Sequence, residues 1–348
     1  MSLLYKLLGV VLLIASLVIG WFWQSYTQYQ ITAVGFSGED KTFVIKPGSA
    51  ISTVVNKLIS DGIVTDRSRF MWMVKHNDKA RNIQAGEYII SADMTPKKIL
   101  ETFITGKVKQ HSFTIVEGWN FKQLLVAIRG SDKITHTLTD KTPDEIMKIL
   151  GHENEHPEGR FLPDTYKFPA GMTDKAFLKR AYDAMEAVLK ENWPERNKDL
   201  PFKTAYEALI LASIVEKETG VAREREQIAG VFVRRLKKRM RLQTDPTVIY
   251  GMGDAYNGNV RKKDLIKDTP YNTYRRKGLP PTPIAMPGAA AIKAALHPAE
   301  GDELYFVAKG DGSHYFSATV KEHNKAVRQY QIRSRKKDYR SAPDMDSQ

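Results

Sequence analysis

The chain opens with an uninterrupted apolar stretch. Residues 7–23 read LLGVVLLIASLVIGWFW and contain no charged side chain. About 20 apolar residues in a helix cross the hydrocarbon core of a bilayer. The aromatic residues Trp21, Phe22 and Trp23 at the end of the stretch are typical of the membrane–water interface. We therefore expect a transmembrane helix over residues 1–24.

The charges around this stretch suggest an orientation. Lys6 lies on its N-terminal side, and the next basic residue is Lys41. The positive-inside rule then places the short N-terminus in the cytoplasm and the bulk of the chain in the periplasm, so we expect a single-pass protein of the inner (cytoplasmic) membrane. A cleaved signal peptide is the alternative, but signal peptides end in small residues, whereas this stretch ends in tryptophans.

The pattern after the anchor predicts a polar spacer over 25–41 and then a small α/β subdomain over 42–108. Phe43 and Ile45 alternate as in a strand, Pro47 and Gly48 favour a turn, and the next apolar residues recur at helical spacing. The further elements that we expect in this subdomain are a helix over 70–75, a strand over 85–91 and a helix opened by Thr95-Pro96.

The rest of the chain predicts a larger mixed domain over 109–337, followed by a polar tail over 338–348. A second strand–turn–helix module over 113–128 opens this domain. We expect helices near 174–192, 204–219, 224–240, 288–296 and 320–336, and a hairpin over 303–318 that turns at 310–313. The fold class is therefore α+β, preceded by a transmembrane helix.

Composition narrows the possible chemistry and partners. The 348 residues include no cysteine, which excludes disulfides, thiolate metal sites and cysteine nucleophiles. The net charge of +13 favours anionic partners. Because the anchor places the basic domain outside the cytoplasm, we expect anionic lipid or a cell-wall polymer rather than nucleic acid. The basic runs at 234–239 and 335–337 are interpreted as solvated helix faces, with binding to such anionic partners as the alternative.

One short motif suggests a metal site and is rejected. Residues 152–156 read HENEH and match the zinc motif H-E-x-x-H, which requires both histidines on one face of a helix. Gly151 precedes the motif and Pro157 follows it, so we interpret it as a solvated loop. We expect neither a metal nor a cofactor.

The helix expected over 204–219 carries the strongest candidate for catalysis, Glu218. At about 100° per residue, Glu218 falls near the middle of the apolar side of this helix, at its C-terminal end. That side is formed by Ile210, Leu211, Ile214 and Val215. Desolvation and the negative pole of the helix both raise the pKa of a carboxyl group at this place, as a general acid near neutral pH requires.

Two further points bear on Glu218. Glu216 lands on roughly the opposite side of the helix, with Ser213. The residues alone leave open that Glu218 pairs with a basic residue such as Arg223 and only closes the helix end. Around it, however, aromatic residues alternate with Gln, Asn and Asp on proline-braced loops, which is typical of a carbohydrate cleft. These loops cover 158–166, 242–251 and 270–284.

At these residues the sequence resembles a known family. The motifs are EGRFLPDTY (158–166), SIVEKET (213–219), LQTDPTVIYG (242–251) and the pair PYNTY and GLPPTPI within 270–284. They resemble the YceG-like endolytic murein transglycosylases, usually abbreviated MltG, over nearly the whole chain. Region 42–108 is similar to the LysM-like peptidoglycan-binding subdomain of that family. The resemblance therefore implies an α+β catalytic domain with its catalytic Glu on a helix.

The resemblance also implies an activity, that of a lyase. Family enzymes cut the β-1,4 bond between N-acetylmuramic acid and N-acetylglucosamine inside peptidoglycan strands without water, leaving a 1,6-anhydro end and terminating strand elongation. The catalytic Glu of the family falls on Glu218. Tyr166, Gln243, Asp245 and Asn272 are implied to hold the sugars. Cell-wall synthesis enzymes are further expected partners.

Two other functions stay open at this point. A non-catalytic membrane protein that binds peptidoglycan needs only the LysM-like module. A hydrolase of the same bond needs a second carboxylate, and Asp245 or Asp164 is available for that role.

Overall fold

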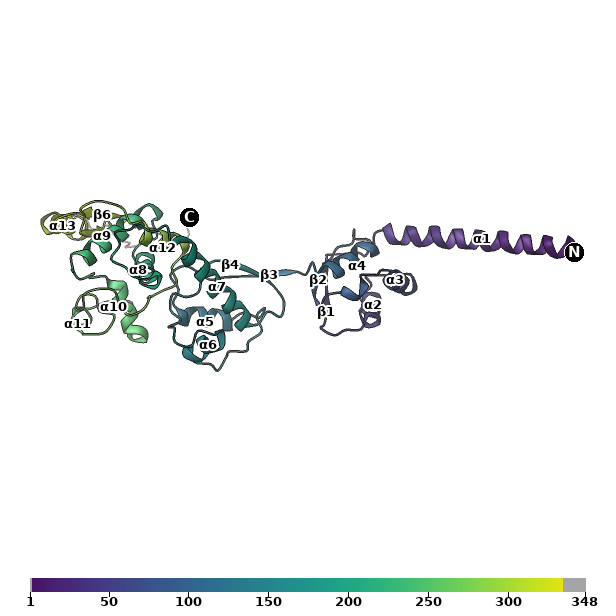
Figure 1. The fold of residues 1–348 in the computed structure, drawn as a ribbon, viewed down its shortest axis with the longest axis horizontal. Helices are drawn as coiled ribbons and strands as arrows, with labels where there is room; N and C mark the ends of the chain where they lie inside the picture. Colours follow the sequence, from purple (N-terminus) through teal and green to yellow (C-terminus); the bar gives the residue numbers. More distant parts are fainter. Residues whose placement is uncertain (1, 334–348) are drawn as a thin grey trace. The chain divides into compact units, whose positions relative to one another are not determined.

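The structure is a computed structural model in which residues 2–333 are described, and it combines helices with short two-stranded sheets (Figure 1). The chain divides into two compact units. Unit 1 consists of Met1–His111 with Lys167–Ala170, and unit 2 of Ser112–Tyr166 with Gly171–Gln348. The mixed α and β content agrees with the fold class expected from the sequence.

Unit 1 contains the expected alternation of strands and helices. Its elements are α1 (Ser2–Ile31), β1 (Lys41–Ile45), α2 (Ile51–Ser60), α3 (Arg67–Lys75), η1 (Ala80–Asn82), β2 (Gly86–Ile90) and α4 (Pro96–Thr105). Strands β1 and β2 pair antiparallel, with Phe43 opposite Tyr88. Both rings are fully buried and pack against Phe103 of α4, at ring-centroid distances of 5.6 and 4.7 Å. This aromatic cluster fixes α4 on the sheet.

Helix α1 is long and apolar enough to cross a membrane, by its length and composition. It also extends further than expected, because residues 25–31 continue the helix instead of starting a spacer. Tyr26 is only 6% exposed and belongs to the core of unit 1. The expected spacer over 25–41 is therefore wrong for its first part, where the helix packs on the folded unit.

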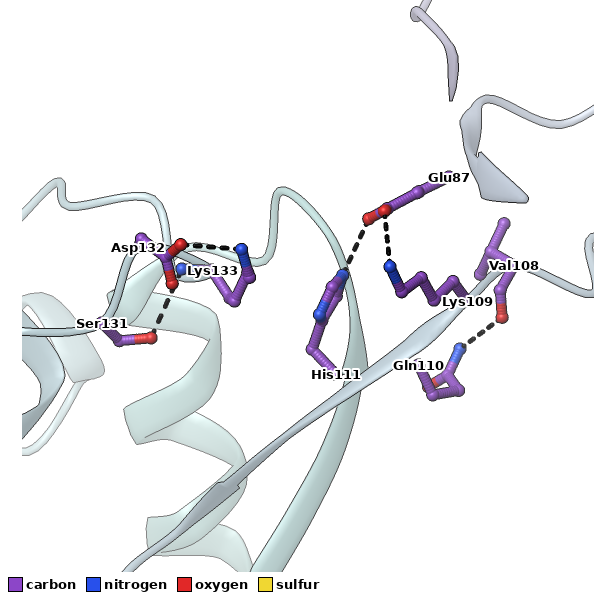
Figure 2. A network of polar contacts seen from close by, with 8 residues as sticks. All are labelled: Glu87, Val108, Lys109, Gln110, His111, Ser131, Asp132 and Lys133. Atoms are coloured by element: carbon purple, nitrogen blue, oxygen red, sulfur yellow. Dashed lines mark hydrogen bonds and ion pairs between the residues drawn. The ribbon is translucent and has the colours of Figure 1, made fainter. Parts of the chain in front are cut away.

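A polar cluster holds residues 109–111 to strand β2. Glu87 accepts a hydrogen bond from Lys109 Nζ at 3.0 Å and pairs with His111 Nε2 at 2.8 Å (Figure 2). The hydrogen bond with His111, and after it the one from Lys109, lowers the pKa of Glu87. The chain leaves β2 and α4 through this cluster and enters β3.

The elements after residue 109 follow the predicted order. They are β3 (Gln110–Thr114), α5 (Phe121–Arg129), α6 (Pro143–Leu150), β4 (Thr165–Pro169), α7 (Asp174–Asn192), α8 (Ala205–Glu218), η2 (Ala222–Glu224), α9 (Arg225–Lys237), α10 (Asp245–Met252), η3 (Gly253–Ala255), α11 (Lys262–Ile266), α12 (Ala289–Leu296), β5 (Tyr305–Ala308), β6 (His314–Ser317), α13 (Val320–Val327) and η4 (Arg328–Arg333). The expected tail over 338–348, the end of the helix expected over 320–336 and the basic run at 335–337 lie outside the described residues.

Helix α8 is the centre of unit 2. It starts with a reciprocal capping box between Thr204 and Glu207, as the sequence indicates. Every residue from 208 to 215 is buried, and the helix contacts α9, α10 and α12. The expected apolar side is buried, and neighbouring helices also cover the opposite side of this stretch, including Ser213.

The motif at 158–166 stabilises this core through hydrogen bonds and close packing. Glu158 is 3% exposed and accepts hydrogen bonds from the Phe121 backbone N–H and the Tyr250 hydroxyl, both at 3.1 Å. Gly159 has a φ of +77°, and a Cβ there would lie 2.5 Å from the Pro283 side chain, so only glycine fits. The motif thereby joins α5, α10 and the proline-rich loop.

The basic run at 234–239 also has a structural role. Arg234 Nε donates to the Glu303 carbonyl oxygen at 2.7 Å, and Arg235 Nε donates to that of Leu304 at 2.6 Å. These bonds tie α9 to the segment before β5. The interpretation of this run as a solvated helix face is therefore wrong for Arg234 and Arg235.

Candidate active site

Unit 2 contains a cavity of about 830 Å³ with Glu218 in its wall. Three segments line it around that residue: the end of α8, the start of α10 with the preceding loop, and the β5–β6 hairpin with α13. Aromatic and polar side chains alternate along this lining. A cavity of this size, with aromatic and polar side chains in its lining, suits a hydroxyl-rich ligand.

Glu218 is the half-buried last residue of α8, and its carboxylate accepts a hydrogen bond from the Thr244 hydroxyl at Oε1. Burial raises the pKa of Glu218 to about 7. The Thr244 hydrogen bond opposes this shift, the Asp245 carboxylate adds to it, and the Arg235 guanidinium lowers the pKa again. Near neutral pH, Glu218 can therefore both give and take a proton.

The loop that carries Thr244 is held in an unusual conformation. Gln243 has a φ of +49°, the left-handed region that costs a residue with a side chain about 1–2 kcal/mol. Its N–H donates to the Thr273 carbonyl oxygen at 3.2 Å, and the Thr244 N–H donates to the Thr273 hydroxyl at 3.1 Å. Strain of this kind persists only where the surroundings fix the backbone. Here it aims the Thr244 hydroxyl at Glu218.

A second carboxylate stands in the same wall. Asp245 opens α10 and accepts a hydrogen bond from the Tyr274 hydroxyl at 2.6 Å, and both residues line the cavity. The negative charge of Asp245 is one cause of the raised pKa of Glu218. Tyr274 also offers a ring on which a sugar face can stack.

The lining that the β5–β6 hairpin and α13 contribute was missed by sequence reasoning. His314 is buried, and its Nδ1 lies 2.8 Å from Glu224 Oε2, whose other oxygen accepts from the His314 N–H at 3.0 Å. His323 stacks on Tyr305 at a ring-centroid distance of 5.3 Å. Tyr305, His314 and His323 line the cavity, whereas Glu224 does not. The one signal in the sequence was the concentration of aromatic and histidine residues in the predicted hairpin and the helix after it.

The structure brings together Glu218, Gln243 and Asp245, but not the other two candidate residues. Tyr166 is 4% exposed, and its hydroxyl donates to the Leu162 carbonyl oxygen at 2.8 Å. Asn272 is 1% exposed and donates its amide to backbone carbonyl oxygens of the 264–267 segment. Neither lines the cavity. We therefore leave Tyr166 and Asn272 out of the set that we propose to contact sugar.

Two other buried carboxyl groups lie away from the cavity lining. Glu216 accepts from the Gly288 N–H, at the start of α12, at 3.0 Å, and burial raises its pKa. It points away from Glu218, as the helical periodicity predicts, but into protein rather than into solvent. Burial also raises the pKa of Glu158, to about 7. Both groups serve as acceptors for helix N-termini.

The H-E-x-x-H match at 152–156 forms a turn and not a helix. Its two histidines therefore do not share a helical face, as the flanking Gly151 and Pro157 indicate.

Acid–base chemistry at this site is expected to depend on pH through Glu218. A pKa raised to about 7 means that the carboxyl is protonated below that pH and loses its proton above it. If protonated Glu218 starts the reaction, kcat/KM falls as the pH rises through about 7. Thr244→Val removes the hydrogen bond that lowers this pKa, so the fall should move to higher pH. Measuring kcat/KM from about pH 5 to pH 9 for the parent and for Thr244→Val tests the fall and its shift. A kcat/KM that does not change with pH would contradict the role of Glu218.

The fold and this site define a member of the YceG-like family. The profile of that family matches residues 43–329, so the chain belongs to it. The chain is 35% identical over 308 residues to the endolytic murein transglycosylase of Bacillus subtilis, covering 82% of this chain and 83% of that protein. The enzyme of the same name from Streptococcus pneumoniae strain D39 is 26% identical, over 83% of this chain and 58% of its own length.

A solved structure gives the same result. The crystal structure of a YceG-like protein from Listeria monocytogenes is similar to this chain with a TM-score of 0.53 and 33% identity. The similarity covers 83% of this chain and 99% of that one.

Proposed function

We propose that this protein is a membrane-anchored endolytic murein transglycosylase. It is a lyase that cuts the bond between N-acetylmuramic acid and N-acetylglucosamine within peptidoglycan strands and leaves a 1,6-anhydro end. The observation that carries the proposal is Glu218, a single half-buried carboxyl group whose pKa is raised to about 7 in the wall of a large cavity. The endolytic murein transglycosylase names of the B. subtilis and S. pneumoniae relatives support it.

In the first step, protonated Glu218 gives its proton to the glycosidic oxygen as the bond to C1 breaks. Glu218 Oε1 accepts the hydrogen bond from Thr244, and we assign delivery of the proton to Oε2, the other oxygen of the same carboxyl group. The Asp245 carboxylate, on the same wall, is placed to offset positive charge that develops at C1.

In the second step, the Glu218 carboxylate takes the proton of the C6 hydroxyl, whose oxygen attacks C1 of the same sugar. The nucleophile is already part of the substrate, so no carboxylate is needed to activate water, and proximity supplies much of the rate. Gln243 and Tyr274 contact the sugars. The net charge of +13 suits stem peptides that carry carboxylates.

The other parts of the chain hold the catalytic unit close to its substrate. Unit 1 acts as a LysM-like module that binds peptidoglycan, and α1 is the single-pass anchor in the inner membrane, with its N-terminus in the cytoplasm. The catalytic unit then works in the periplasm, where it terminates nascent strands beside cell-wall synthesis enzymes. The apolar length of α1 and the matches to the named relatives support this arrangement.

A hydrolase of the same bond is the second candidate function, because Asp245 lines the cavity with Glu218. The product decides between them. We expect mass spectrometry of digested peptidoglycan to find muropeptides one water lighter than the hydrolytic product, since ring closure replaces hydrolysis. A product of full hydrolytic mass would contradict the lyase, and no product from a folded protein would favour a pure binding role.

A further inference from the structure

The contacts between α1 and α3 fix the direction in which α3 runs. Phe22 lies edge-to-face with Trp72 at 6.0 Å between ring centroids. Arg69 Nη2 donates to Ser25 Oγ at 2.8 Å. Further along α1, the Tyr29 hydroxyl donates to the backbone carbonyl oxygen of residue 66, at 3.3 Å. Residue numbers rise on α1 as they fall on α3, so the two helices run antiparallel.

Helix α4 connects the segment after α1 with the segment around η1. The chain just before it is tied to the segment that follows α1, because the Val34 N–H donates to the Met94 carbonyl oxygen at 2.8 Å. Near the other end of α4, the Phe103 carbonyl oxygen accepts from the Gln84 N–H, just after η1, at 3.0 Å. One end of α4 thus lies beside the segment that follows α1, and the other end lies beside η1; α4 itself contacts α1.

The second of these ends is close to the membrane surface if α1 spans the bilayer as proposed above. The aromatic residues Trp21, Phe22 and Trp23 mark the end of the hydrocarbon core. Trp72 packs on Phe22, so it marks the interface. Lys75 is three residues further along α3 in the direction of the membrane, or about 4.5 Å. The headgroup layer is about 5–8 Å thick on each side of the core.

This end of unit 1 is basic and exposed. Residues 75–81 carry Lys75, Lys79 and Arg81 against the single acidic residue Asp78, and all four side chains are exposed. The His76 ring contacts the Trp72 ring, tilted against it, at 4.1 Å between ring centroids, which extends the aromatic contact towards the same surface. The sequence analysis did not single out this cluster, because its position relative to α1 depends on the packing of α3.

We propose that Lys75, Lys79 and Arg81 bind anionic phospholipid headgroups and hold unit 1 against the membrane surface. The proposal rests on the transmembrane anchor proposed above but not on the reaction. Each basic side chain near an anionic surface strengthens adsorption about fivefold, so the three together favour the bound state by about 100-fold. Unit 1 is then fixed at one height above the bilayer, which restricts the glycan strands that it can reach.

The test uses the full chain in lipid nanodiscs and benefits from its lack of cysteine. Asp78→Cys introduces one label site at the basic end. Asp93→Cys, between the backbone contacts of Ala92 and Met94 to the segment after α1, is the matched control at the other end. A fluorophore at residue 78 should be quenched by a spin-labelled headgroup much more than one at residue 93, and only when the discs contain phosphatidylglycerol.

Charge reversal separates lipid binding from simple proximity. K75E/K79E/R81E in the Asp78→Cys background should lower the quenching to the level at residue 93, whereas K97E/K98E should leave it unchanged. Equal quenching at residues 78 and 93, or quenching that ignores the lipid charge, would overturn the proposal. A chain that does not incorporate into discs would overturn it together with the anchor. Release of anhydro product from a soluble glycan is expected to survive the triple reversal, so loss of lipid contact and loss of the reaction are distinguishable.

Discussion

Glu218→Gln is expected to remove nearly all release of anhydro-muropeptides. The amide keeps the shape of the side chain and can still accept from Thr244. It can neither give a proton to the leaving oxygen nor take one from the C6 hydroxyl. General acid–base catalysis contributes about 10²–10⁴-fold, and here one residue serves both steps. The measurement is the rate of product release by mass spectrometry.

Glu216→Gln is the matched control, two residues earlier on the same helix. Its amide oxygen can still accept from the Gly288 N–H, and the residue does not line the cavity, so cleavage should fall much less. An inactive Glu216→Gln with an active Glu218→Gln would contradict the assignment of the catalytic residue.

A melting curve shows whether Glu218→Gln is folded. The folded protein binds the Glu218 proton more tightly than the unfolded chain, whose Glu pKa is about 4.3. Stability from this group is therefore present at low pH and is lost as the pH rises from about 4 towards 7. The variant lacks this loss, so above pH 7 it should be as stable as the parent or more stable.

The helices and strands could be largely predicted from the sequence because their signals are local. Capping residues such as Thr204 and Thr319, and the helical spacing of apolar residues, depend only on near neighbours. The full enclosure of α8 could not be predicted, because α9 and α12 come from later in the chain. The helical extension of α1 was missed because residues 24–31 are mostly polar and form part of the interface with α3.

The candidate site was predictable where its residues are contiguous. Gln243 and Asp245 flank Thr244 on one short loop, so finding the loop found them together. Residue type alone did not show which way Tyr166 and Asn272 point. A buried amide that satisfies backbone carbonyls has the same sequence signature as one that binds a sugar hydroxyl. His314 was missed for a related reason. Side chains alternate between the two faces of a hairpin, and the sequence does not show which face lines the cavity.

Asn272→Ala is expected to destabilise unit 2, although the sequence suggested a sugar contact. Its Nδ2 donates to the carbonyl oxygens of Asp264, Leu265 and Lys267, at 3.2, 3.1 and 2.6 Å. Its Oδ1 accepts from the Tyr274 N–H at 2.9 Å. Alanine leaves these buried groups without their partner, which should cost about 2–4 kcal/mol. The melting temperature of the full chain in detergent should fall by about 5–10 °C.

The matched control is Asn259→Ala, an exposed asparagine in the lining of the cavity that contains Glu218, which should change stability by less than about 0.5 kcal/mol. Asn272→Ala should also slow cleavage, because the loop that it braces carries Thr273, which fixes the Thr244 backbone. A sugar contact would instead weaken cleavage with the melting temperature unchanged. That result would return Asn272 to the binding site and show that its hydrogen bonds to the backbone are replaceable by water. If the melting temperature and the cleavage rate both fall, Asn272 is the residue that holds the active-site loop. Glu218 then depends on Asn272 indirectly, because this loop fixes the Thr244 that hydrogen-bonds to it.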